Sequence, residues 1–302
     1  MNRFAAFPLA FMVSVSSFFA VQTPVVLAQN ATPAAIPAVH HENAVVYGEA
    51  DGQQLLLDVA QPPPAAEPRP AVVLIHGGAM MFSDRGDLTA HAAALGAAGY
   101  VTFNIDYRLV DEAGNNPWPA QLDDAQLAVR WIRANAEHYG VDPDRICAYG
   151  HSAGGNLAAQ LGTRDTRETG DPALADYSSR VSCVIELAGE MDQSIPSIIP
   201  DDEMIFNLLL GGTRDEVPEA YRDLSPISHV DPNDAPFLIM HGADDEFVPV
   251  EHARRMTDAL HAASIEVVYA ELPVADHFIW LDWQESGPLT LAFLESQLGP
   301  TD

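Results

Sequence analysis

The chain has 302 residues, of which 48% are hydrophobic, so it can bury a sizeable core. Its composition excludes collagen, a coiled coil and a wholly disordered chain. The formal net charge is −29, and all 14 basic residues are arginine. Such a surface repels nucleic-acid phosphates and anionic lipid, so we expect no nucleic-acid partner.

The first thirty residues differ from the rest of the chain. Arg3 gives a short positive start, residues 4–21 are uncharged and mostly apolar, and small residues lead up to Ala28. This pattern predicts a signal peptide over residues 1–28, cleaved after Ala28. We therefore expect an exported protein, periplasmic or extracellular, without membrane association once the signal is removed. The alternative is an uncleaved anchor, which Pro8 and the serines in the apolar run disfavour.

Residues 29–42 begin with an alanine- and proline-rich stretch without periodicity, which predicts a disordered tether. The remaining residues, 43–302, are expected to form one globular domain. It opens with a hairpin of Val45–Glu49 and Leu55–Ala60, joined by the turn Asp51-Gly52.

Strands and helices then alternate to the end of the chain. Further strands are predicted at Ala71–Ile75, Val101–Tyr107, Arg145–Tyr149, Val181–Ala188, Pro236–Met240 and Val267–Leu272. Helices are predicted at Leu88–Ala98, residues 120–138, Asn156–Gly162, Val250–Ala263 and Pro288–Leu298. Continuous apolar strands alternating with helices predict an α/β fold, with a mostly parallel central sheet covered on both faces.

The stretch from 191 to 230 breaks this alternation. It is rich in loops and prolines and contains one short apolar piece, Ile205–Leu210. We interpret it as a lid-like insertion over one end of the sheet, where it would form a pocket wall.

The two cysteines, Cys147 and Cys183, both fall in predicted buried strands. Two cysteines cannot supply a disulfide framework, although they could pair in an oxidising compartment. We expect two free thiols that pack as small apolar residues.

Residues 150–155 read GHSAGG, directly after a predicted strand and before a predicted helix. A G-x-S-x-G sequence in this context is typical of a nucleophile elbow, in which a strained turn exposes the serine at the carboxyl edge of a sheet. Ser152 is therefore the candidate nucleophile. The alternative is a tight turn without catalytic function.

A serine nucleophile needs a base held by an acid, and in this kind of sheet the acid and then the histidine follow it in the chain. His277 lies in a loop after the last predicted strand and is the preferred base. His252 and His261 fall on a predicted helix where we expect surface positions, and His241 is expected to support the turn at Gly242. The remaining histidine after the serine is His229.

Four aspartates are candidates for the acid. Asp244 and Asp245 lie in the loop after the strand that ends at Met240, and spacing alone does not separate them. Asp192 follows the preceding strand and is a third candidate. Asp276 adjoins His277, which makes it hard for its carboxylate to reach the far ring nitrogen.

The sequence LIHGGAMMF, residues 74–82, places two glycines after a buried strand. The backbone N–H groups of Gly77, Gly78 and Ala79, with that of Ala153 after the serine, are candidates for an oxyanion hole. Met80, Met81 and Phe82 follow and either line the pocket or pack in the core.

These stretches resemble the α/β-hydrolase superfamily, in particular the small serine esterases with a His-Gly-Gly-Gly oxyanion motif. The similarity runs from residue 71 to 283 and includes VVLIHGGA, NIDYRL, GHSAGGNLAA, LSPISHV, APFLIMHGADDEFVPVEHA and DHFIW. The resemblance assigns the acid to Asp245, through the pattern H-G-x-x-D-x-x-V-P, and the histidine of the closing loop to His277. It implies a serine carboxylic-ester hydrolase that needs no metal or cofactor and acts on small-molecule esters.

The chain departs from the resemblance in two places. Ala79 stands where the third oxyanion glycine is expected, and His151 precedes the serine where an aspartate is common. The short N-terminal part favours the feruloyl- and acetyl-esterase-like branch without a large cap, which implies short-chain or aromatic acyl groups. The alternatives are an amide-directed hydrolase of aminopeptidase or arylformamidase type, and a non-catalytic binding protein on the same fold. No pattern indicates an oligomeric state.

Overall fold

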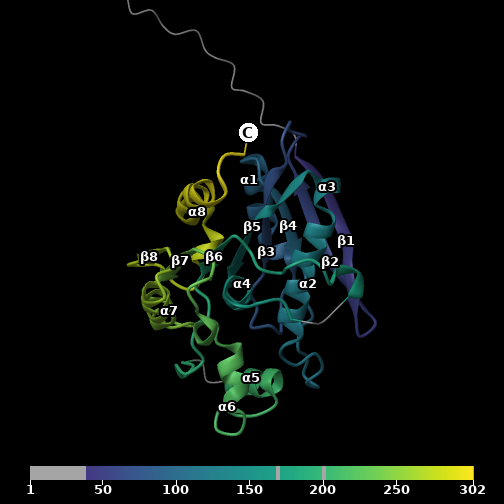
Figure 1. Ribbon diagram of the computed structural model, residues 1–302. Helices are drawn as coiled ribbons and strands as arrows, with labels where there is room; N and C mark the ends of the chain where they lie inside the picture. The colour runs from purple at the N-terminus through teal and green to yellow at the C-terminus, as the bar shows by residue number, and fades with distance from the viewer. Residues whose placement is uncertain (1–38, 168–170, 199–201, 302) are drawn as a thin grey trace, which may run out of the picture. The chain divides into compact units, whose positions relative to one another are not determined.

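The computed structural model describes residues 39–167, 171–198 and 202–301, which belong to one compact unit (Figure 1). The predicted signal peptide and residues 29–38 of the predicted tether lie outside the described residues. The sequence predicted that residues 40–42 belong to the tether, and this prediction is wrong. These residues begin a strand that pairs along its length with the next one.

Eight strands form one sheet in the order β1-β2-β4-β3-β5-β6-β7-β8. β1 and β2 are antiparallel to their neighbours, and the other strands pair in parallel. The strands are β1 His40–Ala50, β2 Gln53–Gln61, β3 Arg69–Ile75, β4 Val101–Ile105, β5 Val141–His151, β6 Cys183–Leu187, β7 Phe237–Gly242 and β8 Val267–Leu272. The predicted α/β class, the hairpin and the mostly parallel sheet are confirmed.

Helices cover both faces of this sheet (Figure 1). They are α1 Thr89–Ala97, α2 Ala120–Ala134, α3 Ala136–Tyr139, α4 Ala153–Thr163, α5 Asp202–Leu210, α6 Pro218–Leu224, α7 Glu251–Ala262 and α8 Trp283–Leu298. The predicted helix at 120–138 is divided into α2 and α3. Helix α8 begins five residues before the predicted start at Pro288, because the Asp282 side chain caps it by accepting from the Gln284 N–H.

The alternation of side chains along the strands divides the core in two. On β3, Val72 and Leu74 pack with α1 and α8, whereas Val73 and Ile75 pack with α2 and α4. All four are completely buried. Apolar residues at successive positions of a parallel strand thus supply two cores, one on each face of the sheet.

The connection between β6 and β7 contains the predicted insertion. It is more helical than the sequence indicated, since it carries α5, α6 and a short 3-10 helix at Pro226–His229. In Figure 1, α5 and α6 lie together (green), and the rings of Phe206 and Tyr221 join them with centroids 5.9 Å apart. Residues of α5 line a cavity together with Ala79 and Ala153, which follow β3 and β5, so the insertion lies beyond the carboxyl ends of these strands.

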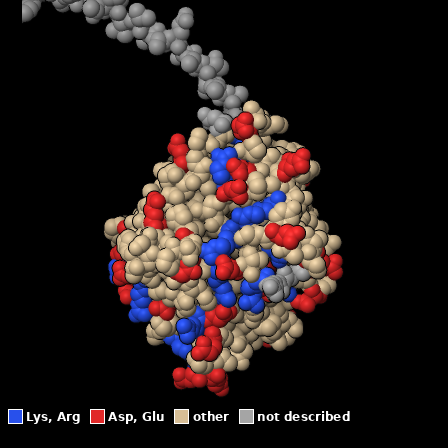
Figure 2. All heavy atoms as spheres, viewed as in Figure 1, with Lys and Arg blue, Asp and Glu red and all other residues tan. Residues whose placement is uncertain are grey.

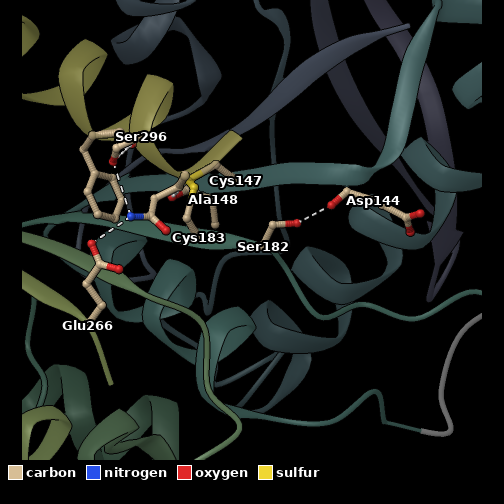
Figure 3. Close-up of a disulfide and its surroundings, with 9 residues drawn as sticks. Asp144, Cys147, Ala148, Ser182, Cys183, Glu266 and Ser296 are labelled. Carbon is tan, nitrogen blue, oxygen red and sulfur yellow. Dashed lines mark hydrogen bonds between the residues drawn. A yellow bond between two sulfur atoms is a disulfide. The ribbon is translucent and has the colours of Figure 1, made fainter. Parts of the chain in front are cut away.

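Cys147 and Cys183 form a disulfide between β5 and β6 (Figure 3). The two residues are direct partners in the register of these parallel strands, and their Cα atoms are 4.6 Å apart. This separation lies in the range that a disulfide spans. The prediction of two free thiols is wrong, because the sequence does not reveal that the two strands are neighbours in register.

Acidic side chains are spread over the face shown in Figure 2, with arginines placed among them. Many arginines among the described residues are paired with carboxylates. Arg180, for example, contacts Asp165 at 3.0 Å and Asp234 at 3.1 Å. Among the described residues, no helix combines the length and the apolar character that crossing a membrane requires.

Candidate active site

The predicted site residues meet at one edge of the sheet. Ser152 follows the carboxyl end of β5, the glycine loop follows β3, Asp245 follows β7 and His277 follows β8. Because these strands are parallel, the residues after them lie on the same edge, where ligands bind in open α/β sheets.

Ser152 lies in a sharp turn between β5 and α4. Its backbone has φ 53° and ψ −125°, a conformation that residues with a side chain rarely adopt. The turn is fixed by a hydrogen bond from the Ser152 N–H to the Leu187 carbonyl at 2.8 Å. It also requires glycine on both sides. A Cβ at Gly150 would lie 2.1 Å from the Gly154 oxygen, and a Cβ at Gly154 would lie 2.1 Å from the Ile75 oxygen. The predicted elbow is thus present in geometry.

His277 connects the serine to a carboxylate. Its Nε2 lies 3.0 Å from the Ser152 Oγ, and its Nδ1 lies 2.8 Å from Oδ2 of Asp245. Since a carboxylate only accepts, Nδ1 carries the proton and Nε2 is free to accept from the serine hydroxyl. His277 and Asp245 are both buried. The structure therefore joins the three predicted residues in one hydrogen-bond chain.

Asp245 is held by four groups. Its Oδ1 accepts from the N–H groups of Phe247 and Val248, both at 2.8 Å. Its Oδ2 contacts His277 and also Nε2 of His241, at 3.2 Å. Burial raises the pKa of Asp245, but the hydrogen bonds from the two histidines outweigh it and hold the pKa below its ordinary value. The carboxylate is therefore ionised at neutral pH.

The other acid candidates do not reach His277. Asp244 is exposed. Asp276 caps its own turn by accepting from the Phe278 N–H. Asp192 pairs with Arg255 at 2.9 Å.

The remaining histidines take other positions. His241 supports its turn as predicted, since its Nε2 donates to the Val248 carbonyl at 2.9 Å. His252 is buried rather than at the surface, which corrects the prediction, because its Nδ1 accepts from the Asp192 N–H at 3.2 Å. His261 is exposed, and His229 contacts the Asp223 carbonyl at 3.0 Å.

The prediction that the Gly77 N–H belongs to the oxyanion hole is wrong. The N–H of Gly77 donates to Nε2 of His151 at 3.1 Å, so it is already occupied. The Gly77 carbonyl accepts from the Tyr107 hydroxyl at 3.1 Å, and the Gly78 carbonyl accepts from the N–H groups of residues 81 and 82. In a trans peptide the next N–H points the opposite way, so the N–H groups of Gly78 and Ala79 point away from these contacts. Ala79 reaches this geometry with a positive φ of 52°.

In the sequence, His151 stood out only as a departure from the family resemblance. In the structure it holds the glycine loop in place through the Gly77 N–H. Its ring stacks on Trp280 with centroids 3.9 Å apart and planes at 20°. Burial lowers the pKa of His151 well below its ordinary value, so the ring is neutral and Nε2 can accept. No sequence signal places Trp280 beside it, because the contact joins the last residue of β5 to a short 3-10 helix, Ile279–Leu281, far along the chain.

A cleft of about 410 Å³ opens above Ser152. It is lined by the glycine loop, by His151 and His277, and by exposed or half-buried aromatic side chains, with further residues from the insertion and the loop after β7. The aromatic lining residues are Phe82, Phe247, Phe278 and Trp280. Of the three residues after the glycine loop, only Phe82 lines this cleft. Met81 packs against the core, as the alternative interpretation held, whereas Met80 is buried in the core and also lines a smaller cavity beside the cleft.

Glu186, a second buried carboxylate, lies behind the site on β6. It is completely buried, accepts from the Gly189 N–H at 3.1 Å, and is electrostatically coupled to His241 and Asp245. Burial raises its pKa to about 7. Within the described part of the chain, no cluster of three or more His, Cys, Asp or Glu side chains could hold a metal ion.

A family model described as BD-FAE matches residues 57–260. Esterase LipC of Mycobacterium tuberculosis is 35% identical over 257 residues, which are 82% of this chain and 62% of that protein. The probable carboxylic ester hydrolase LipM of the same organism is 30% identical over 78% of this chain and 56% of its own length. The chain thus spans less than two thirds of either relative.

Two solved structures show the same fold. The thermophilic esterase Est2 of Thermogutta terrifontis, with propionate bound, superimposes with a TM-score of 0.73 at 26% identity, covering 88% of this chain and 97% of that one. A truncated carbohydrate esterase from gut microbiota gives a TM-score of 0.72 at 24% identity, covering 88% of this chain and 98% of that one. By its sequence match and its sheet, this chain belongs to the BD-FAE family of α/β-hydrolases.

Proposed function

We propose that this protein is a serine carboxylic-ester hydrolase with a triad of Ser152, His277 and Asp245. The observation that carries the proposal is the continuous hydrogen-bond chain from the Ser152 hydroxyl through His277 to Asp245, at the floor of an open cleft. The names of the matched relatives, which are esterases and carboxylic ester hydrolases, support the same reaction class.

In the first half of the reaction, His277 Nε2 takes the proton from Ser152 as its Oγ bonds to the ester carbonyl carbon. The negative charge that develops on the carbonyl oxygen is met by the N–H groups of Gly78, Ala79 and Ala153. His277 then gives the proton to the leaving alkoxide, and the alcohol departs from an acyl-serine.

In the second half, His277 takes a proton from water, and the hydroxide oxygen bonds to the acyl carbon. The carboxylic acid leaves as the proton returns to Ser152. Asp245 remains ionised throughout, holding the ring orientation and balancing the imidazolium charge. All proton transfers pass through His277, so the mechanism requires no metal or cofactor.

Turnover of p-nitrophenyl acetate tests this function. We expect hydrolysis by the wild-type protein, loss of it in Ser152→Ala, and retention in the control Ser228→Ala, whose serine is exposed in the insertion. Turnover that survives Ser152→Ala would refute the proposed nucleophile.

An amide-directed reaction uses the same residues, so the substrate must separate it from ester hydrolysis. We expect p-nitrophenyl acetate to be cleaved far faster than p-nitroacetanilide, which carries the same acyl group on an amide nitrogen. The reverse order would favour the amidase alternative. Absence of any serine-dependent turnover would favour the binding-protein alternative.

We also propose that the protein is exported after removal of residues 1–28. The apolar N-terminal run supports this proposal, and the Cys147–Cys183 disulfide adds independent support, because disulfides persist in oxidising compartments. Fractionation of cells producing the full chain, with N-terminal sequencing of the product, tests it. A product that starts at Gln29 outside the cytoplasm is expected.

A further inference from the structure

We propose that the acyl part of the substrate occupies a small apolar cavity beneath helix α5, and that this cavity limits the acyl group to about the size of acetyl. The inference rests on the proposed function and specifies its substrate class. It concerns a space distinct from the open aromatic cleft above Ser152.

The cavity lies between the glycine loop, the start of α4 and the insertion. Its lining residues are Ala79, Met80, Ala153, Asn156, Glu190, Ile205, Phe206, Leu209 and Leu224. Three of these residues, Ala79, Glu190 and Ile205, also line the aromatic cleft. The two spaces therefore adjoin each other beside the proposed oxyanion donors.

The direction of proton transfer decides which space takes which half of the ester. The leaving oxygen must come within hydrogen-bond reach of His277 Nε2, which gives it a proton. His277 lines the aromatic cleft and not the cavity. The alcohol part therefore lies in the cleft. With the carbonyl oxygen held at Ala79 and Ala153, the acyl chain is left to point into the space that those two residues line, which is the cavity.

The cavity is narrow. Its volume is about 20 Å³, room for one small group. Its far wall consists of Phe206, Leu209 and Leu224, all buried and part of the main apolar cluster. Forcing extra methylene groups into such a packed wall typically costs enough free energy to slow a reaction about tenfold or more. An acetyl methyl group fits, whereas a butyryl chain or an aromatic acyl group requires the wall to move.

Glu190 lines both the cavity and the cleft, so the two spaces meet at this residue. The inferred acyl group, set by the size of the cavity, is short and aliphatic.

The experiment compares kcat/KM of the full chain for p-nitrophenyl acetate, butyrate and hexanoate, which differ only in the acyl part. The wild-type protein should prefer acetate over butyrate by about tenfold or more. Two variants enlarge the cavity: Leu209→Ala removes part of the far wall, and Ile205→Ala, at a half-buried position, opens the junction. Met204→Ala is the matched control, because Met204 lies on the same helix with its side chain 59% exposed.

We expect Leu209→Ala and Ile205→Ala to raise butyrate relative to acetate by about tenfold, and Met204→Ala to leave the ratio unchanged. A thermal unfolding transition shows that each variant is folded before its kcat/KM values are compared. The comparison of the three esters with the wild-type protein tests the inference without any variant. Serine-dependent turnover with equal or rising rates from acetate to hexanoate would overturn the cavity inference and leave the esterase function in place. Absence of serine-dependent turnover of all three esters would instead overturn the proposed function, and the cavity inference with it.

Discussion

The backbone N–H of Gly77 donates to the imidazole of His151 at 3.1 Å, which ties the glycine loop after β3 to the turn that carries Ser152. The contact is close on both sides, since a Cβ at Gly77 would lie 2.7 Å from the His151 ring. The stack on Trp280 fixes the plane of that ring. The residue before the serine thus positions the backbone that presents the proposed oxyanion donors.

Replacing His151 with alanine removes this acceptor and the stacking partner of Trp280. We expect His151→Ala to lower kcat for p-nitrophenyl acetate by about tenfold to a hundredfold with a small change in KM, since the oxyanion forms only in the transition state. His151→Gln can still accept through its amide oxygen and should retain more of the rate. Equal kcat in wild type and His151→Ala would contradict a positioning role.

The neighbouring aspartates Asp244 and Asp245 offer a matched pair. Asp245→Asn removes the charge that orients His277, and we expect kcat to fall by about a thousandfold to ten-thousandfold, as in other serine triads. Asp244→Asn, at an exposed position, should leave kcat within about twofold. Steady-state hydrolysis of p-nitrophenyl acetate by both variants measures this. Similar losses in the two variants would count against Asp245 as the acid.

Glu186 makes stability depend on pH. Its pKa rises from 4.5 to about 7 on folding, chiefly through burial, with His241 lowering it and Asp245 raising it. Because the folded state retains the proton that the unfolded state has lost, stability is full below about pH 4.5 and falls as pH rises through 7, by about 3 kcal/mol in all.

Glu186→Gln avoids this loss and keeps an oxygen for the Gly189 N–H. We expect the variant to exceed the wild type in free energy of unfolding at pH 8, and to differ little from it at pH 5. Urea unfolding of both proteins at the two pH values measures the difference. The same difference at both values would show that ionisation of Glu186 is not responsible.

The Cys147–Cys183 disulfide closes a loop with a sequence separation of 36. By the loop-closure relation, its loss should lower the free energy of unfolding by about 3–4 kcal/mol. We expect this decrease in the double variant Cys147→Ala/Cys183→Ala. Reductant present during unfolding should lower the stability of the wild type toward that of the variant, and leave the variant unchanged. Identical wild-type curves with and without reductant would argue against the bond.

Much of the fold can be predicted because strands such as β3 are apolar at successive positions, as at residues 71–75, and because strands and helices alternate along most of the chain. The insertion could not be predicted in the same way. Helix α6 is only seven residues long and holds its place through a few buried side chains such as Tyr221 and Leu224, which give no periodic signal. Pairing of the cysteines depends on strand order and register, which local pattern does not determine.

Ser152 could be predicted from a local motif, and His277 from its loop after the last strand. Asp245 could be separated from its neighbour Asp244 only through the resemblance to the α/β-hydrolases, because spacing alone does not separate the two. The roles of His151 and Tyr107 could not be predicted, since each acts on the glycine loop from another part of the fold. The same contact explains the error at Gly77, whose N–H would be free if His151 were a residue without an acceptor.

Covalent labelling tests the central claim most directly. We would treat the full chain with a fluorophosphonate probe and locate the adduct by peptide mass spectrometry, with Ser152→Ala and His277→Ala as comparisons. The account predicts an adduct on Ser152 in the wild type, none in Ser152→Ala and much slower labelling in His277→Ala. An adduct on another residue, or ester turnover by protein that the probe leaves unlabelled, would contradict it.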